Sequence, residues 1–148
     1  MNSLPNPWNY PTYAEWNKEA QKIISNHIIP SLANRVDFFN ILKNGQNLII
    51  KAEASWCKPC KKCTPLIYEL LMNSPSNVKM MVLDIDKHRD LASYFKINKV
   101  PTFISYKGKD RMDYSVGADE NTIRSFFHKV SLYDGEHKKF PTNKNYWN

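Results

Sequence analysis

The sequence predicts one α/β domain in which helices cover both faces of a mixed β-sheet. Short apolar runs rich in β-branched residues alternate with amphipathic stretches of helical periodicity, and two strand-like runs near the C-terminus are separated by a short turn. The chain has 148 residues, enough to bury roughly 68 to 70% of its unfolded surface in one core. We expect a leading helix and then the order βαβαββα, with no internal repeat and no second core.

Composition places the chain among ordinary globular proteins. Hydrophobic residues make up 42% and charged residues 24%, which argues against wholesale disorder. No apolar run approaches the ~18 residues of a membrane helix, and the start of the chain lacks the basic and apolar regions of a signal peptide. We therefore expect a cytoplasmic, non-secreted protein without a membrane partner. The net charge of +7 alone does not indicate nucleic-acid binding, so no nucleic-acid partner is expected.

Residues 1–27 are expected to form an extended arm and then a helix. Thr12 and Glu15 make the capping-box pattern T-x-x-E. Apolar residues follow at helical spacing: Tyr13, Trp16, Ala20, Ile23 and Ile24. The pattern predicts a helix over about 13–25, and its apolar face needs a partner elsewhere on the protein.

The next elements lead toward the cysteines. Residues 28–32 predict a short strand, and Pro30 within it suits the edge of a sheet. A helix over 36–43 is expected to end before Gly45. Its predicted core-facing residues are spaced by three: Val36, Phe39 and Leu42. Residues 48–54 are apolar and partly β-branched, and they predict a buried strand that runs into the cysteine cluster.

The middle of the chain continues the alternation of helix and strand. A helix is predicted over about 60–73, with a kink rather than a break at Pro65. A strand over 78–85 and a helix over 87–95 follow, and Asp86 is the expected cap of that helix.

The C-terminal part predicts a hairpin and a closing helix. Residues 102–106 and 111–116 read as paired strands with a turn at Lys107 and Gly108. Asp119 is the expected cap of the last helix. Its core-facing residues are Ile123, Phe126, Phe127 and Val130. The remainder is polar and reads as a loose tail.

All three cysteines lie in the segment Trp-Cys-Lys-Pro-Cys-Lys-Lys-Cys at 56–63. Such clustering differs from the spread framework of a secreted disulfide scaffold and indicates redox chemistry or metal binding. Disulfide exchange needs one thiolate that attacks and a second thiol that resolves the mixed disulfide. Cys57 and Cys60 meet both demands at a helix start, because the helix stabilises a negative sulfur on Cys57 while Cys60 lies one turn inside.

Cys63 leaves several interpretations open. Its place on the apolar stripe of the helix favours a role in the core. The spacing C-x2-C-x2-C is also found at metal and cluster sites, but a four-ligand zinc site would have to recruit His27 or His88. A regulatory disulfide with Cys57 or Cys60 is the third interpretation. We expect no bound metal.

The run Trp-Cys-Lys-Pro-Cys at 56–60 resembles the Trp-Cys-Gly-Pro-Cys of the thioredoxin family. Pro65, the run Val-Pro-Thr at 100–102 and Gly117 resemble, in the same order and spacing, the family's helix-kink proline, its cis-proline loop and the glycine before its last helix. The resemblance covers roughly 28–130. It implies a thioredoxin fold, a mixed central β-sheet flanked by helices, here with an extra N-terminal helix over 1–27 and a polar C-terminal tail over 131–148.

The resemblance also implies roles for individual residues. Cys57 would attack the substrate disulfide and Cys60 would resolve the mixed disulfide. The backbone of Val100 and Pro101, with a cis peptide bond between them, would bind an extended substrate segment. Trp56 and Gly117 would lie beside it, although a large aromatic next to a buried strand is also ordinary packing.

Two positions depart from the family pattern. Lys51 stands where thioredoxin has a buried Asp that relays the resolving thiol's proton, and Val82 stands where the partner Lys of that Asp would be. Lys51 and Glu53 point to the same face of a strand. In one interpretation they replace that pair, and Glu53 accepts the proton of Cys60. In the other, Lys51 extends along the sheet to water and Glu53 is a solvated companion.

Lysines surround the motif. Lys58 replaces the family's usual Gly and is expected to shift the redox potential by only roughly 5 to 20 mV. A basic collar is expected at the cysteine end of the fold: Lys58, Lys61, Lys62, Lys96 and Lys99. The collar is either a solvated face or a surface that steers substrates with acidic flanks toward the site.

The sequence thus predicts a thioredoxin-like thiol–disulfide oxidoreductase that acts on disulfide-containing proteins. It needs no bound cofactor, and a thioredoxin reductase or another donor would supply electrons, in keeping with roles in electron transport and cell redox homeostasis. The alternative is a redox-inactive or slow interaction module built on the same fold. The terminal extensions are expected to pack on the domain, support a homodimer or dock a partner.

Overall fold

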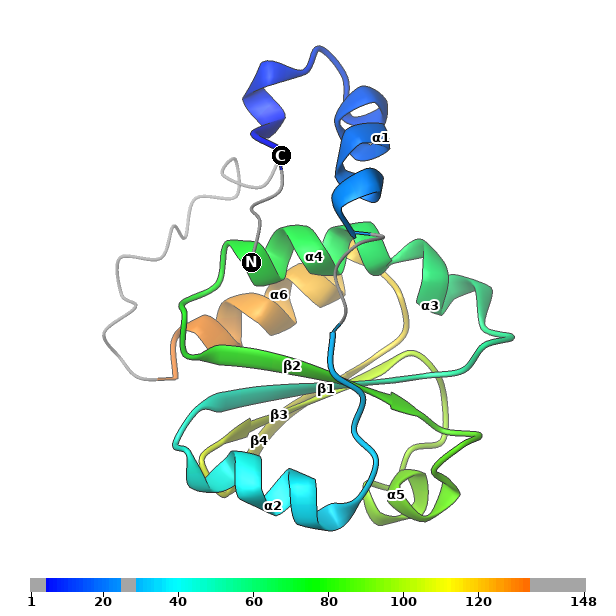
Figure 1. Ribbon diagram of the computed structural model, residues 1–148, viewed down its shortest axis with the longest axis vertical. Coiled ribbons are helices and arrows are strands. Elements are labelled where there is room, and N and C mark those ends of the chain that lie inside the picture. The colour runs from blue at the N-terminus through cyan, green and yellow to red at the C-terminus, as the bar shows by residue number, and fades with distance from the viewer. Residues whose placement is uncertain (1–4, 25–28, 134–148) are drawn as a thin grey trace.

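The computed structural model describes residues 5–24 and 29–133 (Figure 1). Four strands form its sheet: β1 (Asn47–Glu53), β2 (Val78–Asp84), β3 (Thr102–Lys107) and β4 (Asp110–Val116). The helices are α1 (Tyr13–Ile24), α2 (Arg35–Lys43), α3 (Lys58–Lys62), α4 (Thr64–Met72), α5 (Arg89–Tyr94) and α6 (Glu120–Ser131), with a short 3-10 turn at Pro7–Asn9. None of the helices in the described part of the chain is long and apolar enough to cross a membrane.

The sheet is mixed, as the sequence predicts, and its strand order is β2-β1-β3-β4. β1 pairs in parallel with β2 and antiparallel with β3, and β3 pairs antiparallel with β4. The expected edge strand over 28–32 is reduced to a single bridge between Ser31 and Val82, and residue 28 lies outside the described residues. Two hydrogen bonds hold this segment to β2: Leu32 N–H to Val82 O at 2.8 Å and Val82 N–H to Pro30 O at 2.9 Å.

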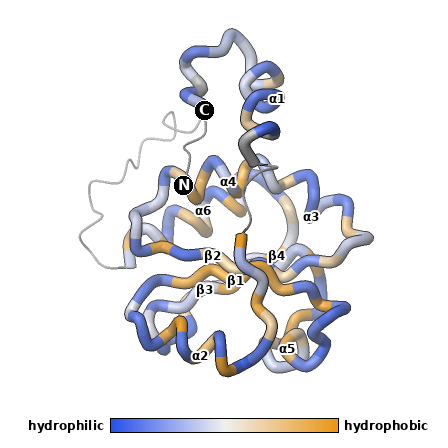
Figure 2. The backbone as a smooth tube through the Cα atoms, in the orientation of Figure 1, coloured by the Kyte–Doolittle hydropathy of each residue, from blue (hydrophilic) through white to orange (hydrophobic). Residues whose placement is uncertain are grey.

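Helices cover both faces of the sheet (Figure 1): α4 and α6 lie on one face, and α2 and α5 on the other. Side chains of β1 and β3 alternate between these two layers, because successive strand residues point to opposite faces. Ile49 and Phe103 pack under α4 and α6, whereas Ile50 and Ile104 pack under α2 and α5. Figure 2 accordingly shows hydrophobic colour along the central strands and mixed colour along the outer helices.

The N-terminal helix α1 packs against α4 on the outside of the layered core (Figure 1). Trp16 and Ala20 are buried there together with Tyr68 of α4. The indole N–H of Trp16 donates to the carbonyl of Pro5 at 2.6 Å, which holds the preceding arm against the helix. The predicted apolar face of this helix thus has its partner in α4, while the side chains of Ile23 and Ile24 lie outside the described residues.

The predicted set of core-facing residues of α2 is partly wrong. Val36 and Phe39 are exposed, and the buried residues are Phe38 and Leu42, spaced by four rather than three. Both spacings fit a helix, and the choice is made by the aromatic packing of Phe38 against Phe95 and Tyr106, with ring centroids 5.0 Å apart in each case. The side chain of Asn34 caps this helix by accepting from the N–H of Asp37 at 2.9 Å.

Two other local predictions need correction. Residue 63 separates α3 from α4, so the helix is divided rather than only kinked, because Pro65 has no N–H to donate to the preceding turn. Helix α5 begins at Arg89, later than predicted, and Asp86 is not its cap. The carboxylate of Asp84 instead accepts the N–H groups of Asp86 and Lys87. By contrast, Asp119 caps α6 as predicted, by accepting from the N–H of Thr122 at 3.0 Å.

Candidate active site

The cysteine pair lies where β1 passes into α3. Cys57 is the N-cap residue of that helix, and Cys57 and Cys60 form a disulfide with their Cα atoms 5.3 Å apart. The sulfur of Cys57 also accepts the backbone N–H of Cys60 at 3.2 Å. Pro59 occupies the first turn, where a missing N–H costs little. The local sequence therefore places both sulfur atoms in one helical turn, as exchange between them requires.

Apolar groups surround the disulfide. Ala54, Cys57 and Cys60 form a small buried cluster, and Ile85 and Val100 pack against it. Val100 precedes Pro101 through a cis peptide bond, as the resemblance implied. The N–H of Gly117 donates to Pro101 O at 2.9 Å, which brings the last predicted site residue to the same loop. The structure thus joins three segments that are far apart in the sequence.

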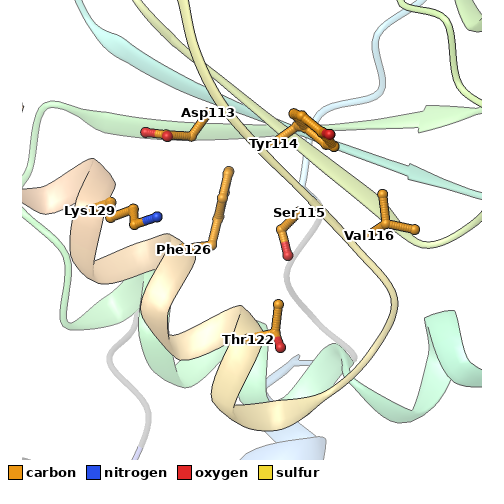
Figure 3. Close-up of a pocket in the computed structure, with 7 residues that line it drawn as sticks. All are labelled: Asp113, Tyr114, Ser115, Val116, Thr122, Phe126 and Lys129. Carbon is orange, nitrogen blue, oxygen red and sulfur yellow. The ribbon is translucent and has the colours of Figure 1, made fainter.

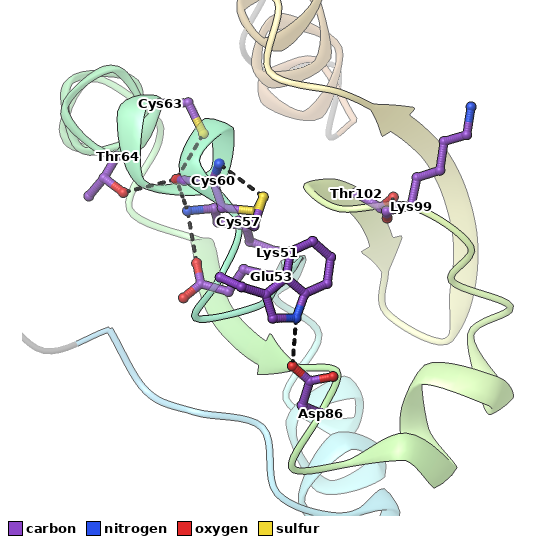
Figure 4. The surroundings of a disulfide bond; sticks show 10 residues. Lys51, Glu53, Cys57, Cys60, Cys63, Thr64, Asp86, Lys99 and Thr102 are labelled. Carbon is purple, nitrogen blue, oxygen red and sulfur yellow. Dashed lines mark hydrogen bonds and ion pairs between the residues drawn. A yellow bond between two sulfur atoms is a disulfide. The ribbon is translucent and has the colours of Figure 1, made fainter.

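Lys51 is buried, with only 3% of its surface exposed, so it does not extend to water. Its ammonium group contacts Glu53 Oε1 at 2.9 Å and donates to the backbone carbonyl of Cys60 at 3.0 Å (Figure 4). The Glu53 side chain is 34% exposed. The geometry therefore favours the interpretation of a charge pair behind the disulfide. Val82 faces Lys51 across the parallel pairing of β1 and β2 and supplies no charge.

The carbonyl of Cys60 collects donors from three side chains (Figure 4). Besides Lys51, the hydroxyl of Thr64 donates to it at 3.2 Å and the thiol of Cys63 at 3.3 Å. Sequence reasoning missed Thr64, whose only signal was its i+4 spacing from Cys60. This carbonyl connects the strand, the helix carrying the disulfide and the start of α4.

Cys63 is the free cysteine, and it is buried. It packs in the core beneath α4 and α6 with Ile67 and Phe103, as its place on the apolar stripe predicted. Burial raises the pKa of the thiol, and the nearby Lys51 ammonium opposes that rise. Among the described residues no group of His, Cys, Asp and Glu could hold a metal ion; His27, one of the two possible zinc ligands, lies outside them.

Trp56 lies at the rim of the site, with 66% of its surface exposed. Its indole N–H donates to Asp86 Oδ2 at 2.9 Å, so the ring is held from the β2–α5 connection. Asp86, which was expected to cap a helix, therefore positions an aromatic beside the disulfide. The sequence offered no signal for this pairing, since the two residues are thirty positions apart.

Hollows flank β4 on both sides. The one between β4 and α6 has a volume of about 470 Å³ and includes Asp113, Phe126 and Lys129 in its lining (Figure 3). It contains none of the predicted site residues, and its charged groups are of both signs. The other, of about 490 Å³, lies beside the loop that carries Pro101, and its lining includes Lys96, Lys99 and Tyr114.

Comparison with known proteins identifies the family. The thioredoxin family model matches residues 30–129. The chain belongs to the thioredoxin family. It is 30% identical to thioredoxin H5 of Oryza sativa subsp. japonica over 64% of this chain and 71% of that protein, and 32% identical to mitochondrial thioredoxin of Mus musculus over 64% of this chain and 58% of that one. The structure of oxidised mitochondrial thioredoxin 3 from Saccharomyces cerevisiae superposes with a TM-score of 0.64 at 28% identity, covering 68% of this chain and 94% of that one.

Family membership and the cysteine pair together give the activity. The Cys57–Cys60 pair is at bonding distance within a thioredoxin fold, and the chain is a thiol–disulfide oxidoreductase. Residues 5–24, including α1, precede the matched region. The thioredoxin fold here therefore carries an added layer on α4, on the side away from α2 and α5 (Figure 1).

Proposed function

We propose that the protein transfers two electrons to disulfides of protein substrates, with Cys57 attacking and Cys60 resolving. The observation that carries this assignment is the position of Cys57 at the N-cap of α3, where its sulfur accepts the N–H of Cys60. The same N–H can stabilise a thiolate on Cys57 in the reduced protein. The carbonyl of Cys60 accepts hydrogen bonds from Lys51 and Thr64. These bonds suit Cys60 to keep its place in the helix while Cys57 is bonded to the substrate.

The exchange has two steps. The Cys57 thiolate attacks one sulfur of the substrate disulfide; a bond forms between the two proteins, and the other substrate cysteine leaves as a thiolate. Cys60 then loses its proton and attacks the Cys57 sulfur, which reforms the Cys57–Cys60 disulfide and releases the second substrate thiolate. The substrate is reduced and the protein oxidised, and an electron donor such as a thioredoxin reductase must restore the dithiol.

We propose Glu53 as the acceptor of the Cys60 proton. Its carboxylate contacts the buried Lys51 ammonium, and its partial exposure gives a proton a path to solvent. Lys51 would act as a positioning residue that fixes Glu53 and the Cys60 carbonyl together. Lys58, at the first position of α3, would add a modest favourable charge beside the Cys57 thiolate.

The substrate segment is proposed to bind along Val100, Pro101 and Gly117, with Trp56 at the rim. Val100 packs against the disulfide cluster, and the hydrogen bond from Gly117 to Pro101 holds those two residues together. Trp56 is exposed, and its apolar ring suits contact with a side chain next to the substrate cysteine.

Insulin reduction coupled to a thiol reductant tests the activity directly. We expect turnover by the wild type and its loss in both Cys57→Ser and Cys60→Ser. The Cys60→Ser variant should instead accumulate a mixed disulfide through Cys57. Binding to a partner that survives both substitutions, without turnover by the wild type, would favour an interaction module.

We further propose that the protein works in a reducing compartment, the cytoplasm, in electron transport and cell redox homeostasis. Of its three cysteines, Cys57 and Cys60 form the reactive pair and Cys63 is a buried free thiol, so none forms a purely structural disulfide. Subcellular fractionation tests the location. A mitochondrial or secreted pool would contradict it.

The N-terminal extension is proposed to support a homodimer. Trp8 and Tyr13 expose most of their aromatic surface on this part of the protein, whereas Trp16 is used internally. Sedimentation of the full chain and of a Trp8→Ser/Tyr13→Ser variant tests this: a monomeric wild type at micromolar concentration would contradict it.

A further inference from the structure

A basic hollow lies immediately beside the proposed substrate loop. It is formed by the connection from α5 to β3 on one side and by β4 on the other. Its lining residues are Phe95, Lys96, Ile97, Asn98, Lys99, Thr102, Arg111, Tyr114 and Val116. The charged residues among these, Lys96, Lys99 and Arg111, are all positive and exposed, and no acidic residue lines it. Tyr114, 70% exposed, and Val116 give it an apolar wall.

The backbone at Lys96 gives independent support for a binding role. Lys96 has a φ of 58°, in the left-handed region that favours glycine. It follows α5, where the N–H of Ile97 donates back to Ala92 O at 2.9 Å, an arrangement that usually places glycine at this position. A lysine in this backbone conformation is less favourable than glycine, because its Cβ crowds the backbone there. Its side chain is therefore a candidate for a function outside the fold.

The hollow adjoins the proposed substrate loop in the chain and in the sheet. Lys99 and Thr102 flank the Val100–Pro101 peptide, and the hydroxyl of Thr102 donates to Lys99 O at 2.6 Å. On the other wall, Val116 is paired with Thr102 in the sheet and precedes Gly117. A polypeptide lying along Pro101 and Gly117 would therefore enter the hollow within a few residues.

We propose that this hollow binds an acidic segment of the protein whose disulfide is exchanged at Cys57, with an apolar side chain of that segment against Tyr114. The proposal rests on the exchange activity and adds the class of substrate to it. Charge complementarity selects the occupant. Three cations and no acidic residue line the hollow, so it favours a carboxylate and repels a cation. The basic collar thus divides, because Lys58, Lys61 and Lys62 belong to α3 and do not line the hollow.

Matched substrates test this inference. Two peptides would share one intramolecular disulfide and differ only by a run of Glu or of Gln beside one cysteine, with a second pair carrying the run beside the other cysteine. The enzyme would be the full chain as wild type, as Lys96→Gln/Arg111→Gln, and as the control Lys43→Gln/Lys79→Gln. The control removes the same charge from exposed positions on α2 and β2, away from the hollow.

The measured quantity is the ratio of kcat/KM for the Glu peptide to that for the Gln peptide. In at least one peptide pair we expect a ratio of about 3 to 10 for the wild type and the control, the size given by two partly exposed charge contacts. We expect the ratio to approach one for Lys96→Gln/Arg111→Gln. Raising the ionic strength should reduce the wild-type ratio, because salt screens exposed charges.

Three outcomes would overturn the inference. A wild-type ratio near one in both pairs means that acidic segments are not preferred. Equal falls in both double variants mean that net charge alone attracts the substrate. A mixed disulfide of Cys60→Ser with the Glu peptide that leaves the amide NMR signals of Lys96, Arg111 and Tyr114 unmoved means that the segment binds elsewhere. Failure of the exchange activity would look different, since neither the Glu nor the Gln peptide would then be reduced by the wild type.

Discussion

Positive charge lies both next to the disulfide, at Lys51, and in the hollow beside the Pro101 loop, and its setting differs completely between the two regions. Behind the disulfide, Lys51 is buried between β1 and α3 and contacts both a carboxylate and a carbonyl. In the hollow beside the Pro101 loop, Lys96, Lys99 and Arg111 are exposed. A buried charge must be paired within the fold because water does not reach it, whereas an exposed charge keeps its hydration and is available to a partner. Positive charge is therefore neutralised within the fold in one region and is available to a substrate in the other.

Removing the partner of the buried charge should have the largest effect. Glu53→Gln leaves the Lys51 ammonium with the Cys60 carbonyl but without its carboxylate. Because Glu53 is partly exposed, we expect a loss of about 1 to 3 kcal/mol in the free energy of unfolding, below the 3 to 5 kcal/mol of fully buried pairs. Urea denaturation of the oxidised protein measures it, and stopped-flow kinetics should show a slower resolving step with an altered pH dependence.

Lys51→Met is the matched control for that experiment. It removes the charge and fills similar volume, so its stability should stay within about 1 kcal/mol of the wild type or rise. Equal destabilisation by the two substitutions, or a wild-type pH–rate profile in Glu53→Gln, would contradict the role given to the pair.

The buried thiol beside Lys51 should make stability depend on alkaline pH. Burial raises the pKa of Cys63 above its ordinary value of 9.0, so the folded protein keeps a proton that the unfolded chain releases. The stability that the neutral thiol contributes is complete below pH 9 and is lost as the pH rises above it, at up to about 1.4 kcal/mol per pH unit.

Comparison with Cys63→Ala isolates this effect. Both proteins would be studied in the oxidised state by urea denaturation between about pH 7 and 10, so that the tyrosines contribute equally to each. The stability advantage of the wild type over Cys63→Ala should shrink above pH 9. A difference that stays constant over that range would contradict the raised pKa.

Removing an exposed charge next to the attacking sulfur should have the smallest effect. Lys58 lies at the first position of α3 and is exposed. Its charge favours the thiolate of the reduced protein, so Lys58→Gln should lower the redox potential by roughly 5 to 20 mV. Equilibration with glutathione measures it, with Lys62→Gln as control. A shift as large as 60 mV would mean that Lys58 is far less screened than its exposure indicates.

Much of the fold and the reactive pair could be predicted from the sequence. Strand and helix periodicities located all four strands of the sheet, and the spacing of Cys57 and Cys60 at the end of a buried strand indicated exchange chemistry. The cis bond at Pro101 followed from the family resemblance. These features depend on neighbouring residues, or on a motif that the chain shares with its family.

Features that depend on contacts across the chain were missed. Helical spacing allowed either Phe39 or Phe38 to face the core, and only the aromatic rings of α5 and β3 decide between them. The hydrogen bond of Asp86 to Trp56 and the place of Arg111 in the hollow require knowledge of how distant segments meet.

The contact of Lys51 with a main-chain carbonyl rather than with a sulfur atom has a consequence for the whole reaction cycle. Opening and closing the Cys57–Cys60 bond alters the sulfur atoms, and a proton passes to Glu53, but the Cys60 carbonyl that accepts from the ammonium keeps its covalent structure. We therefore expect this hydrogen bond to tie the central strand to the reactive helix in the oxidised, mixed-disulfide and reduced states alike.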